Sequence, residues 1–490
     1  MENVAVNARK KITMDKYFSQ VKIVTPNNIL KLLEISARSV VSNAEVVNNY
    51  LLVSGKIVAN AVYLTDENRL ENTETTIDFV EKQKTTFVLS ELFGNDELEV
   101  QNVNFSSSEV SFSVAHKTEI YGIYRYYFGD ATKTEDNLVL NKKTLNCLNF
   151  KQTNDENFVV AEEVETNLKD IKILNINSDA ILSSVISAVD KVIIDGQVKV
   201  SAIYSDETGL GEIVKEFEFK QEIAMKNAMP GMTSEAVIKH LNTQIVEQSK
   251  DDKNTLAFVI DLSAKAYLFE NLTIETFDDL FALNNEVVPV YDFAEFEEND
   301  GTSFDEDTVL TQTDISANGD FDDIVGVYQP KVKVIEIQDN GDKLTILSQI
   351  SALAIYKTQS SLSKQDLIYE SKFETEKDPA KKVKSVSASA VVSAFKVKAG
   401  KDLESAFSVY YKIDYEKECA EKFVKSYELK EEKVNTDAGV KVYVTKDAQT
   451  IFEVAKALNV KPELILSQME VDGIFEAGQK VFVYCPLNLV

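Results

Sequence analysis

The chain has 490 residues, more than a single hydrophobic core usually contains, so we predict three or four domains. Hydrophobic residues make up 44% and charged residues 27%, which is typical of a globular protein and argues against wholesale disorder. The formal net charge of -28 would repel nucleic acid and anionic lipid, so we expect neither as a partner.

The chain carries no sequence signal for a membrane or an oxidising compartment. Residues Met1 to Tyr17 contain no apolar run that could serve as the core of a signal peptide. No later stretch approaches the roughly 20 apolar residues that span a bilayer. The three cysteines, Cys147, Cys419 and Cys485, lie far apart, as is typical of a reducing compartment. We therefore predict a cytoplasmic protein without membrane insertion.

Two short segments have apolar residues near helical spacing. The first is Asn27 to Glu34, and the second is Ser234 to Val246, where Ala236, Ile238, Leu241 and Ile245 would share one face. We expect both segments to form short helices.

One thirteen-residue pattern occurs three times, at Leu51 to Tyr63, Val192 to Tyr204 and Leu344 to Tyr356. Each copy ends in tyrosine and has apolar or small residues at every second position, while the alternate positions are more polar. A period of two predicts a long, half-buried β-strand. Copies one and two carry a glycine in mid-strand, Gly55 and Gly196, which indicates a bulge or the close approach of another segment. Ser348 takes this place in copy three.

A second strand-rich block follows each pattern, at Glu109 to Val114, Thr255 to Ile260 and Ser385 to Val392, after a shorter gap in the third copy. Recurring strand pairs predict antiparallel sandwiches or barrels. We therefore predict a mainly β fold of three tandem β-sandwich or barrel-like repeats, followed by a small module of mixed structure. Acidic and polar connecting segments place the boundaries at 1–150, 151–305, 306–435 and 436–490.

The search for chemistry finds no catalytic, cofactor-binding or metal site. The two histidines, His116 and His240, lie in different repeats without a Cys or His at metal-ligand spacing, and we interpret both as surface or structural residues. Acidic clusters such as Glu297 to Gly301 do not have EF-hand spacing. There is no phosphate-binding glycine loop. We expect a protein that is not an enzyme, and a site assembled across the β repeats is the least favoured alternative.

From Lys441 the pattern changes to strand, helix, helix, strand. Thr450 and Glu453 have the spacing of a capping box, which predicts that a helix begins there. Pro462 suits the first turn of a second helix. Gly478 to Tyr484 is expected to form the closing strand.

This segment, Lys441 to Tyr484, resembles LysM, a βααβ module that binds carbohydrate or protein. The residues that fill the family pattern are Thr450, Ile451, Ala455, Val460, Leu464, Gly478, Gln479 and Val481. The first loop reads Asp447-Ala-Gln-Thr450, and Gln468 replaces the usual asparagine. The resemblance implies that two loops on one side bind the ligand, through Asp447, Gln449, Thr450, Ile451, Met469, Glu470, Val471, Ile474 and Phe475.

Together with the three β repeats, the chain resembles the SPOCS-plus-LysM proteins of spore-forming clostridia, which have spore-coat and engulfment functions. The resemblance implies a scaffold in the mother-cell cytosol or at the forespore surface, whose LysM end docks onto the spore-coat basement-layer ATPase. Ile474, Phe475 and Phe452 are the candidate apolar anchors, although Phe452 equally suits a core position. The alternative is a protein of a cell wall or phage tail that binds a peptidoglycan- or chitin-type glycan. We favour protein recognition.

Overall fold

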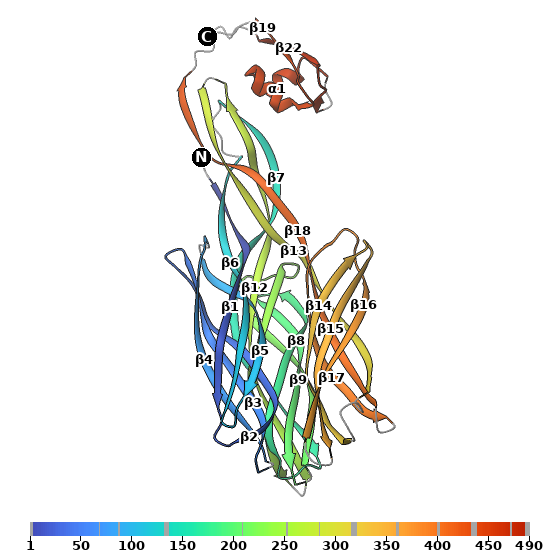
Figure 1. The fold of residues 1–490 in the computed structure, drawn as a ribbon. Coiled ribbons are helices and arrows are strands. Elements are labelled where there is room, and N and C mark those ends of the chain that lie inside the picture. Colours follow the sequence, from blue (N-terminus) through green and yellow to red (C-terminus); the bar gives the residue numbers. More distant parts are fainter. Residues whose placement is uncertain are drawn as a thin grey trace.

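The computed structural model describes residues 3–67, 69–86, 89–131, 137–207, 209–250, 253–283, 285–314, 321–358, 362–398, 402–432, 439–470 and 473–485. Within these residues almost all secondary structure is β-strand, and the two helices are short and near the C-terminus. The prediction of a mainly β fold is confirmed. Figure 1 shows the long strands side by side in one body, with the C-terminal helices beyond them at one end.

Strands β1 to β18 form three groups of six that share one pairing order. In each group the second, third and fourth strands make one antiparallel sheet, and the first, sixth and fifth strands make the other. The two sheets of a group enclose one hydrophobic cluster, which is the architecture of a β-sandwich. We call these groups the first, second and third sandwich.

The first sandwich consists of β1 (Asn3–Val24), β2 (Ile29–Val47), β3 (Tyr50–Thr65), β4 (Leu70–Lys84), β5 (Leu89–Phe105) and β6 (Glu109–Gly129). The second consists of β7 (Leu138–Thr166), β8 (Lys172–Ala188), β9 (Lys191–Asp206), β10 (Gly209–Ala224), β11 (Thr233–Lys250) and β12 (Lys253–Ala282). The third consists of β13 (Asn285–Asp314), β14 (Phe321–Asp339), β15 (Lys343–Thr358), β16 (Leu362–Glu376), β17 (Lys382–Lys398) and β18 (Asp402–Glu432).

The thirteen-residue pattern forms the central strand of the same sheet in every sandwich. It lies in β3, β9 and β15, each of which has a neighbour on both sides. The inward positions predicted from the period of two are buried from Leu51 to Tyr63, and their counterparts in β9 and β15 are buried in the same order, except that Tyr204 is half-buried. The three segments are therefore equivalent elements of sheets with one topology.

The mid-strand glycines lie where an aromatic ring from the next strand crosses the central strand. Gly55 is paired with Phe79 in β4, and Gly196 is paired with Phe219 in β10. A Cβ atom at Gly55 would lie 2.4 Å from the Val40 carbonyl oxygen and 2.8 Å from the Phe79 ring. At Gly196 it would lie 2.5 Å from the Phe219 ring. The expected close approach of another segment is confirmed, and it explains why no side chain fits.

The third sandwich fills this place differently. Ser348 is paired with a small residue, Ser371, and its hydroxyl lies 3.1 Å from the hydroxyl of Tyr411. Tyr411 belongs to β18 in the opposite sheet and stacks on Phe373, with ring centroids 4.6 Å apart. The ring that occupies this part of the core therefore comes across the sandwich, and a serine replaces the glycine.

Both predicted helices of the β repeats are wrong, because the two segments are strands with bulges. Asn27 to Glu34 leads into β2, whose pairing with β3 shifts register twice before residue 35. Ser234 to Val246 lies in β11, whose register shifts between His240 and Asn242. Each shift changes which parity faces the core, so the buried residues of a bulged strand have helix-like spacing.

The third of the strand-rich blocks was also misassigned. Ser385 to Val392 lies in β17, whereas Glu109 to Val114 begins β6 and Thr255 to Ile260 lies in β12. The strand of the third sandwich that matches β6 and β12 in the pairing order is β18. The gap between the pattern and the second block looked shorter in the third copy because the block in β17 lies one strand earlier than the equivalent strand. Residues 150 and 305, near which we expected boundaries, lie inside β7 and β13, and residue 435 is outside the described residues.

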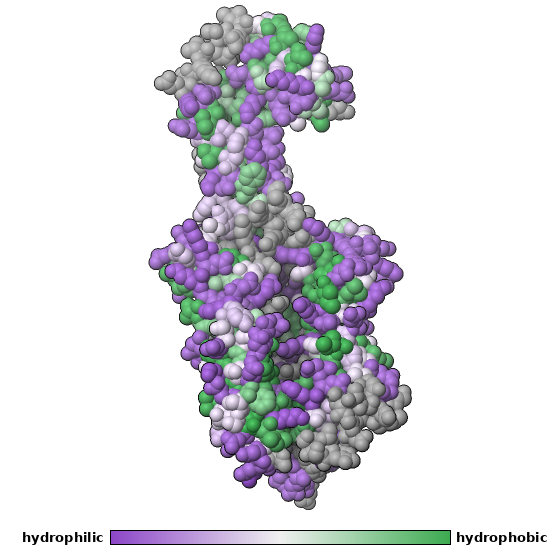
Figure 2. All heavy atoms as spheres, in the orientation of Figure 1, coloured by the Kyte–Doolittle hydropathy of each residue, from purple (hydrophilic) through white to green (hydrophobic). Residues whose placement is uncertain are grey.

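The ends of six strands continue beyond the sandwiches and pack on one another. They belong to β1, β6, β7, β12, β13 and β18, so every sandwich contributes two. We call this bundle the neck, which is the narrower column in Figure 2. Its core residues are Val6, Ala8, Tyr126, Phe128, Ala131, Leu145, Cys147, Ile274, Phe277, Leu280, Ala294, Phe423 and Val424. Because these residues come from all three sandwiches, the neck joins them into one body.

The sandwiches also contact one another directly. Arg9 of the first forms an ion pair with Glu235 of the second. The Lys199 ammonium of the second lies 4.0 Å from the ring centroid of Tyr410 in the third. A further apolar cluster joins residues of all three, Leu70, Leu174, Ile203, Tyr328, Leu353 and Ile355.

Candidate functional site

The C-terminal module has the predicted order of strand, helix, helix and strand. It consists of β19 (Gly439–Val444), β20 (Gln449–Thr450), α1 (Ile451–Leu458), α2 (Pro462–Leu466), β21 (Ile474–Phe475) and β22 (Lys480–Cys485). The first and last strands pair antiparallel. Burial of Val454, Ala455, Ile465, Val481 and Val483 gives the module a hydrophobic core of its own.

The helix boundaries follow the sequence signals. The Thr450 side chain accepts a hydrogen bond from the Glu453 backbone N–H, and the Glu453 carboxylate accepts one from the Thr450 N–H at 2.7 Å. This is the predicted capping box, which satisfies two donors that a helix N-terminus otherwise leaves open. Asn459 ends α1 in the left-handed conformation, and Pro462 stands in the first turn of α2.

The two predicted binding loops lie side by side because β20 pairs with β21. Gln449 is opposite Phe475, and Thr450 is opposite Ile474. Asp447, Thr450, Glu470 and Ile474 are exposed, and the Ile474 side chain is 59% accessible. These side chains give the edge of the module a mixed apolar and acidic surface.

The remaining predicted loop residues are less accessible. Phe475 is fully buried in the module core, so it supports the loop from inside and presents no side chain to a partner. Ile451 and Met469 are half-buried against the same core, and Gln449 is half-buried beside them. Val471 lies outside the described residues.

Phe452, which sequence alone left between anchor and core, is a core residue that attaches the module to the neck. Its ring lies 5.5 Å from that of Phe281 in β12. The Asn459 side-chain amide donates to the Leu283 carbonyl oxygen at 2.9 Å. The Lys456 ammonium lies 2.6 Å from the Asp279 carboxylate. Apolar and polar contacts of α1 therefore fix the module to the end of the second sandwich.

Tyr291 in β13 joins the same contact. Its hydroxyl donates to Asp279 at 2.9 Å. Burial, followed by the hydrogen bond to Asp279 and the negative charge of that carboxylate, raises the pKa of Tyr291 to about 12. Asp279 therefore binds both the Lys456 ammonium of the module and the Tyr291 hydroxyl of the third sandwich.

Gln468, which replaces the asparagine of the LysM pattern, ties α2 to the closing strand. Its side-chain amide donates to the Tyr484 carbonyl oxygen at 2.9 Å and accepts from the Tyr484 N–H at 2.7 Å. A side-chain amide that bonds both backbone groups of one residue acts like a strand neighbour. The longer glutamine is therefore compatible with an ordered module.

Sequence reasoning missed the outer face of the β19–β22 sheet. Its positions, which point away from the helices, carry Val440, Val442, Val444, Phe482 and Tyr484, all of them exposed. The signal that could have revealed it is apolar character on both parities of the closing strand, where Val481 and Val483 alternate with the two aromatic residues.

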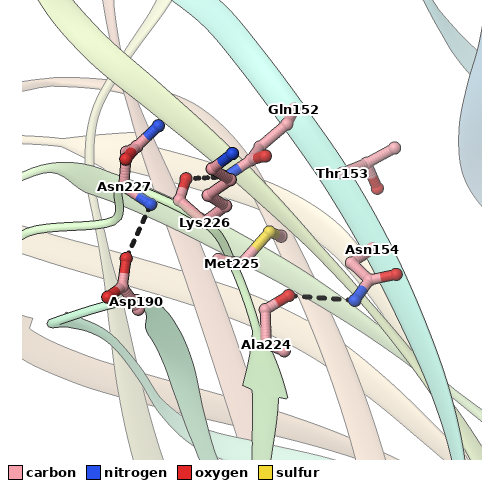
Figure 3. Close-up of a pocket in the computed structure, with 8 residues that line it drawn as sticks. All are labelled: Gln152, Thr153, Asn154, Asp190, Ala224, Met225, Lys226 and Asn227. Atoms are coloured by element: carbon pink, nitrogen blue, oxygen red, sulfur yellow. Dashed lines mark hydrogen bonds between the residues drawn. The ribbon is translucent and has the colours of Figure 1, made fainter.

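A depression of about 640 Å³ opens on the second sandwich. Figure 3 shows the residues that line it. Several of its lining side chains form hydrogen bonds with nearby backbone groups. Gln152 donates to the Lys226 carbonyl oxygen at 2.6 Å, and Asn154 donates to the Ala224 carbonyl oxygen at 2.9 Å. Asp190 accepts from the Asn227 N–H at 2.8 Å. The depression therefore lies over a junction between β7 and the turn after β10.

Both histidines have structural contacts. His116 is buried, with its ring nitrogens 3.3 Å from Glu81 and 3.2 Å from Thr118. His240 lies 2.7 Å from the Thr243 hydroxyl, and burial lowers its pKa to about 4. Among the described residues, no three His, Cys, Asp or Glu side chains are grouped to hold a metal ion. In the same part of the chain, no helix is long and apolar enough to cross a membrane.

A family model described as SipL, SPOCS domain matches residues 162–246. The matched segment begins near the end of β7 and ends in β11, so it lies within the second sandwich. Neither a curated protein nor a solved structure matches the chain. The first and third sandwiches have the same pairing order as the matched one. Residues 162–246 are therefore similar to a SPOCS domain, which supports the SPOCS part of the resemblance found in the sequence.

Proposed function

We propose that this chain is a non-enzymatic scaffold of spore-coat assembly, which binds a coat morphogenetic protein through its LysM-like C-terminal module. The partner that we propose is the spore-coat basement-layer ATPase, and the place is the mother-cell cytosol or the forespore surface. The similarity of residues 162–246 to a SPOCS domain supports the link to sporulation.

The observation that carries this proposal is the way the module is held. All three sandwiches contribute strands to the neck, and α1 packs on its end through Phe452 and Lys456. A module fixed to a rigid support loses less freedom on binding than one on a flexible linker, so more of the contact energy appears as affinity. The long strands thus serve to present a recognition module.

The LysM resemblance has support from local structure. The capping box of Thr450 and Glu453, the left-handed Asn459 and the pairing of β19 with β22 give the βααβ arrangement of that family. The pairing of β20 with β21 brings the two family ligand loops together. We propose that the exposed edge at Asp447, Glu470 and Ile474 contacts the partner.

Ile474 is the apolar anchor that these loops offer. Fully burying an isoleucine side chain contributes about 1.5–3 kcal/mol, and interface energy is concentrated in a few such residues. Asp447 and Glu470 would surround it as a polar rim.

A binding assay with the basement-layer ATPase tests this function. The unchanged full-length chain should bind, and the double variant Ile474→Ala with Glu470→Lys should bind at least about tenfold more weakly. Leu310→Ala is the matched control, since Leu310 is a 79% exposed strand residue of the third sandwich. If the unchanged chain does not bind the ATPase but sediments with purified wall material, the glycan-binding alternative is favoured instead.

A further inference from the structure

The outer face of the β19–β22 sheet is a continuous apolar surface. Val440 is paired with Tyr484, and Val442 is paired with Phe482. Directly opposite residues of antiparallel strands have Cβ atoms about 4.5–5.5 Å apart, so these side chains lie beside each other on one face. Their exposed fractions, with that of Val444, lie between 48% and 63%.

The fold does not need this surface to be apolar. The inner positions of the same strands, including Val481 and Val483, are fully buried against α1 and α2 and supply the apolar contacts of the module. The outer positions of a one-sided sheet ordinarily carry polar residues. Apolar residues on both faces of one small sheet therefore indicate a second contact beyond the module itself.

The position of this face makes it accessible to another molecule. Because α1 packs against the neck, β19 and β22 lie on the far side of the module, as Figure 1 shows. Figure 2 shows hydrophobic side chains gathered at this extremity of the molecule. The Gln468 hydrogen bonds to Tyr484 hold β22 in place, so the face is preformed.

Charge indicates what the face binds. Lys480 is the strand partner of Val444 and is exposed on the same outer face. Lys446 is exposed two residues beyond β19. The chain as a whole carries a net charge of -28, so these two ammonium groups are a local exception on an acidic molecule. A partner segment that places acidic groups beside apolar ones would satisfy both the valines and the lysines.

We propose that the β19–β22 outer face docks an apolar segment of the protein partner that carries acidic residues, a site separate from the two LysM-type loops. This inference rests on the proposed function, because it assigns a second surface to the same partner. The face supplies aromatic and valine contacts, and Lys480 sets the orientation of the acidic flank.

Three variants of the full-length chain test the proposal, with the basement-layer ATPase as the probe. Val442→Thr combined with Phe482→Thr removes apolar area while keeping good strand formers, and it should weaken binding about tenfold or more. Lys480→Glu should weaken binding severalfold, and it should make the affinity less sensitive to salt. Leu310→Thr, at an exposed strand position of the third sandwich, should leave binding unchanged.

A fourth variant, Ile474→Thr, separates this inference from the proposed function. Unchanged affinity of the Val442 and Phe482 double variant, with loss of binding in Ile474→Thr, would overturn the outer-face site and leave the proposed function standing. Absence of binding by the unchanged chain would overturn both. Circular dichroism of each variant checks that loss of binding does not come from unfolding.

Discussion

β4 of the first sandwich and the two strands of the C-terminal sheet differ in the residues that alternate along them. Most exposed positions of β4 are polar, at Asn72, Glu74, Thr76 and Asp78, with Val80 as the one apolar exception, whereas its buried and half-buried positions face the rest of the sandwich. In β19 and β22 the exposed positions are Val440, Val442, Val444, Phe482 and Tyr484, and the buried positions are apolar too.

The difference shows which apolar residues the fold requires. In β4 the fold requires apolar residues on one face only, because the second sheet of the sandwich covers that face and leaves the other to solvent. In the module α1 and α2 cover the inner face, and the outer face remains apolar without any fold-related reason. Burial therefore separates residues that stabilise the chain from residues that are available to a partner.

The largest expected effect compares a covered aromatic residue with an uncovered one. Phe407 is fully buried in the third sandwich, whereas Phe482 is 51% exposed in the module. Phe407→Ala should lower the free energy of unfolding by about 3–5 kcal/mol, because it removes buried area and leaves a cavity. Phe482→Ala should lower it by less than about 1 kcal/mol. Denaturant titration of both variants measures this difference, and equal destabilisation would contradict the assignment of Phe482 to a binding surface.

An intermediate effect compares the sandwiches with each other. Gly55→Ala should destabilise the first sandwich by about 1–3 kcal/mol, because the new Cβ would collide with the Val40 carbonyl and the Phe79 ring. Ser348→Ala, at the equivalent position, adds no atom and should cost only about 1 kcal/mol for the lost hydrogen bond to Tyr411. Thermal unfolding of the two variants checks the order, and the reverse order would contradict the equivalence of these positions.

The smallest effect concerns the attachment of the module to the neck. Asp279→Asn removes a partly exposed ion pair with Lys456, which is worth about 0–1 kcal/mol. It should nevertheless lower the pKa of Tyr291 from about 12, because the carboxylate beside the phenol is one cause of the raised value. The pKa should remain above its usual value, since burial is the larger cause. Tyrosine ring NMR across pH measures it, and Asp278→Asn should lower the pKa of Tyr291 less, because the charge of Asp278 is a smaller cause than that of Asp279.

The sequence predicted those parts of the fold that depend on regular local patterns. The period of two identified β3, β9 and β15 because each of these central strands keeps an unbroken register with one neighbour, β4, β10 or β16, through the segment that carries the pattern. The capping residues Thr450 and Glu453 located the start of α1 to the residue. In both places the local chemistry and the global fold agree.

The sequence failed where pairing decides local structure. β2 and β11 contain bulges, which change the buried parity and imitate helical spacing, and a bulge depends on the partner strand. Placing Ser385 to Val392 in the wrong strand came from matching composition without knowing the sheet order. Phe475 looked like an anchor because no sequence pattern shows which apolar loop residue turns inward.

The central claim is that the module recognises the partner and the sandwiches only present it. Hydrogen–deuterium exchange of the full chain, alone and with the basement-layer ATPase, tests this claim most directly. We predict slower exchange in residues 439–451 and 473–485, with the sandwich strands unchanged. Slower exchange confined to the sandwiches, with the module unaffected, would contradict it.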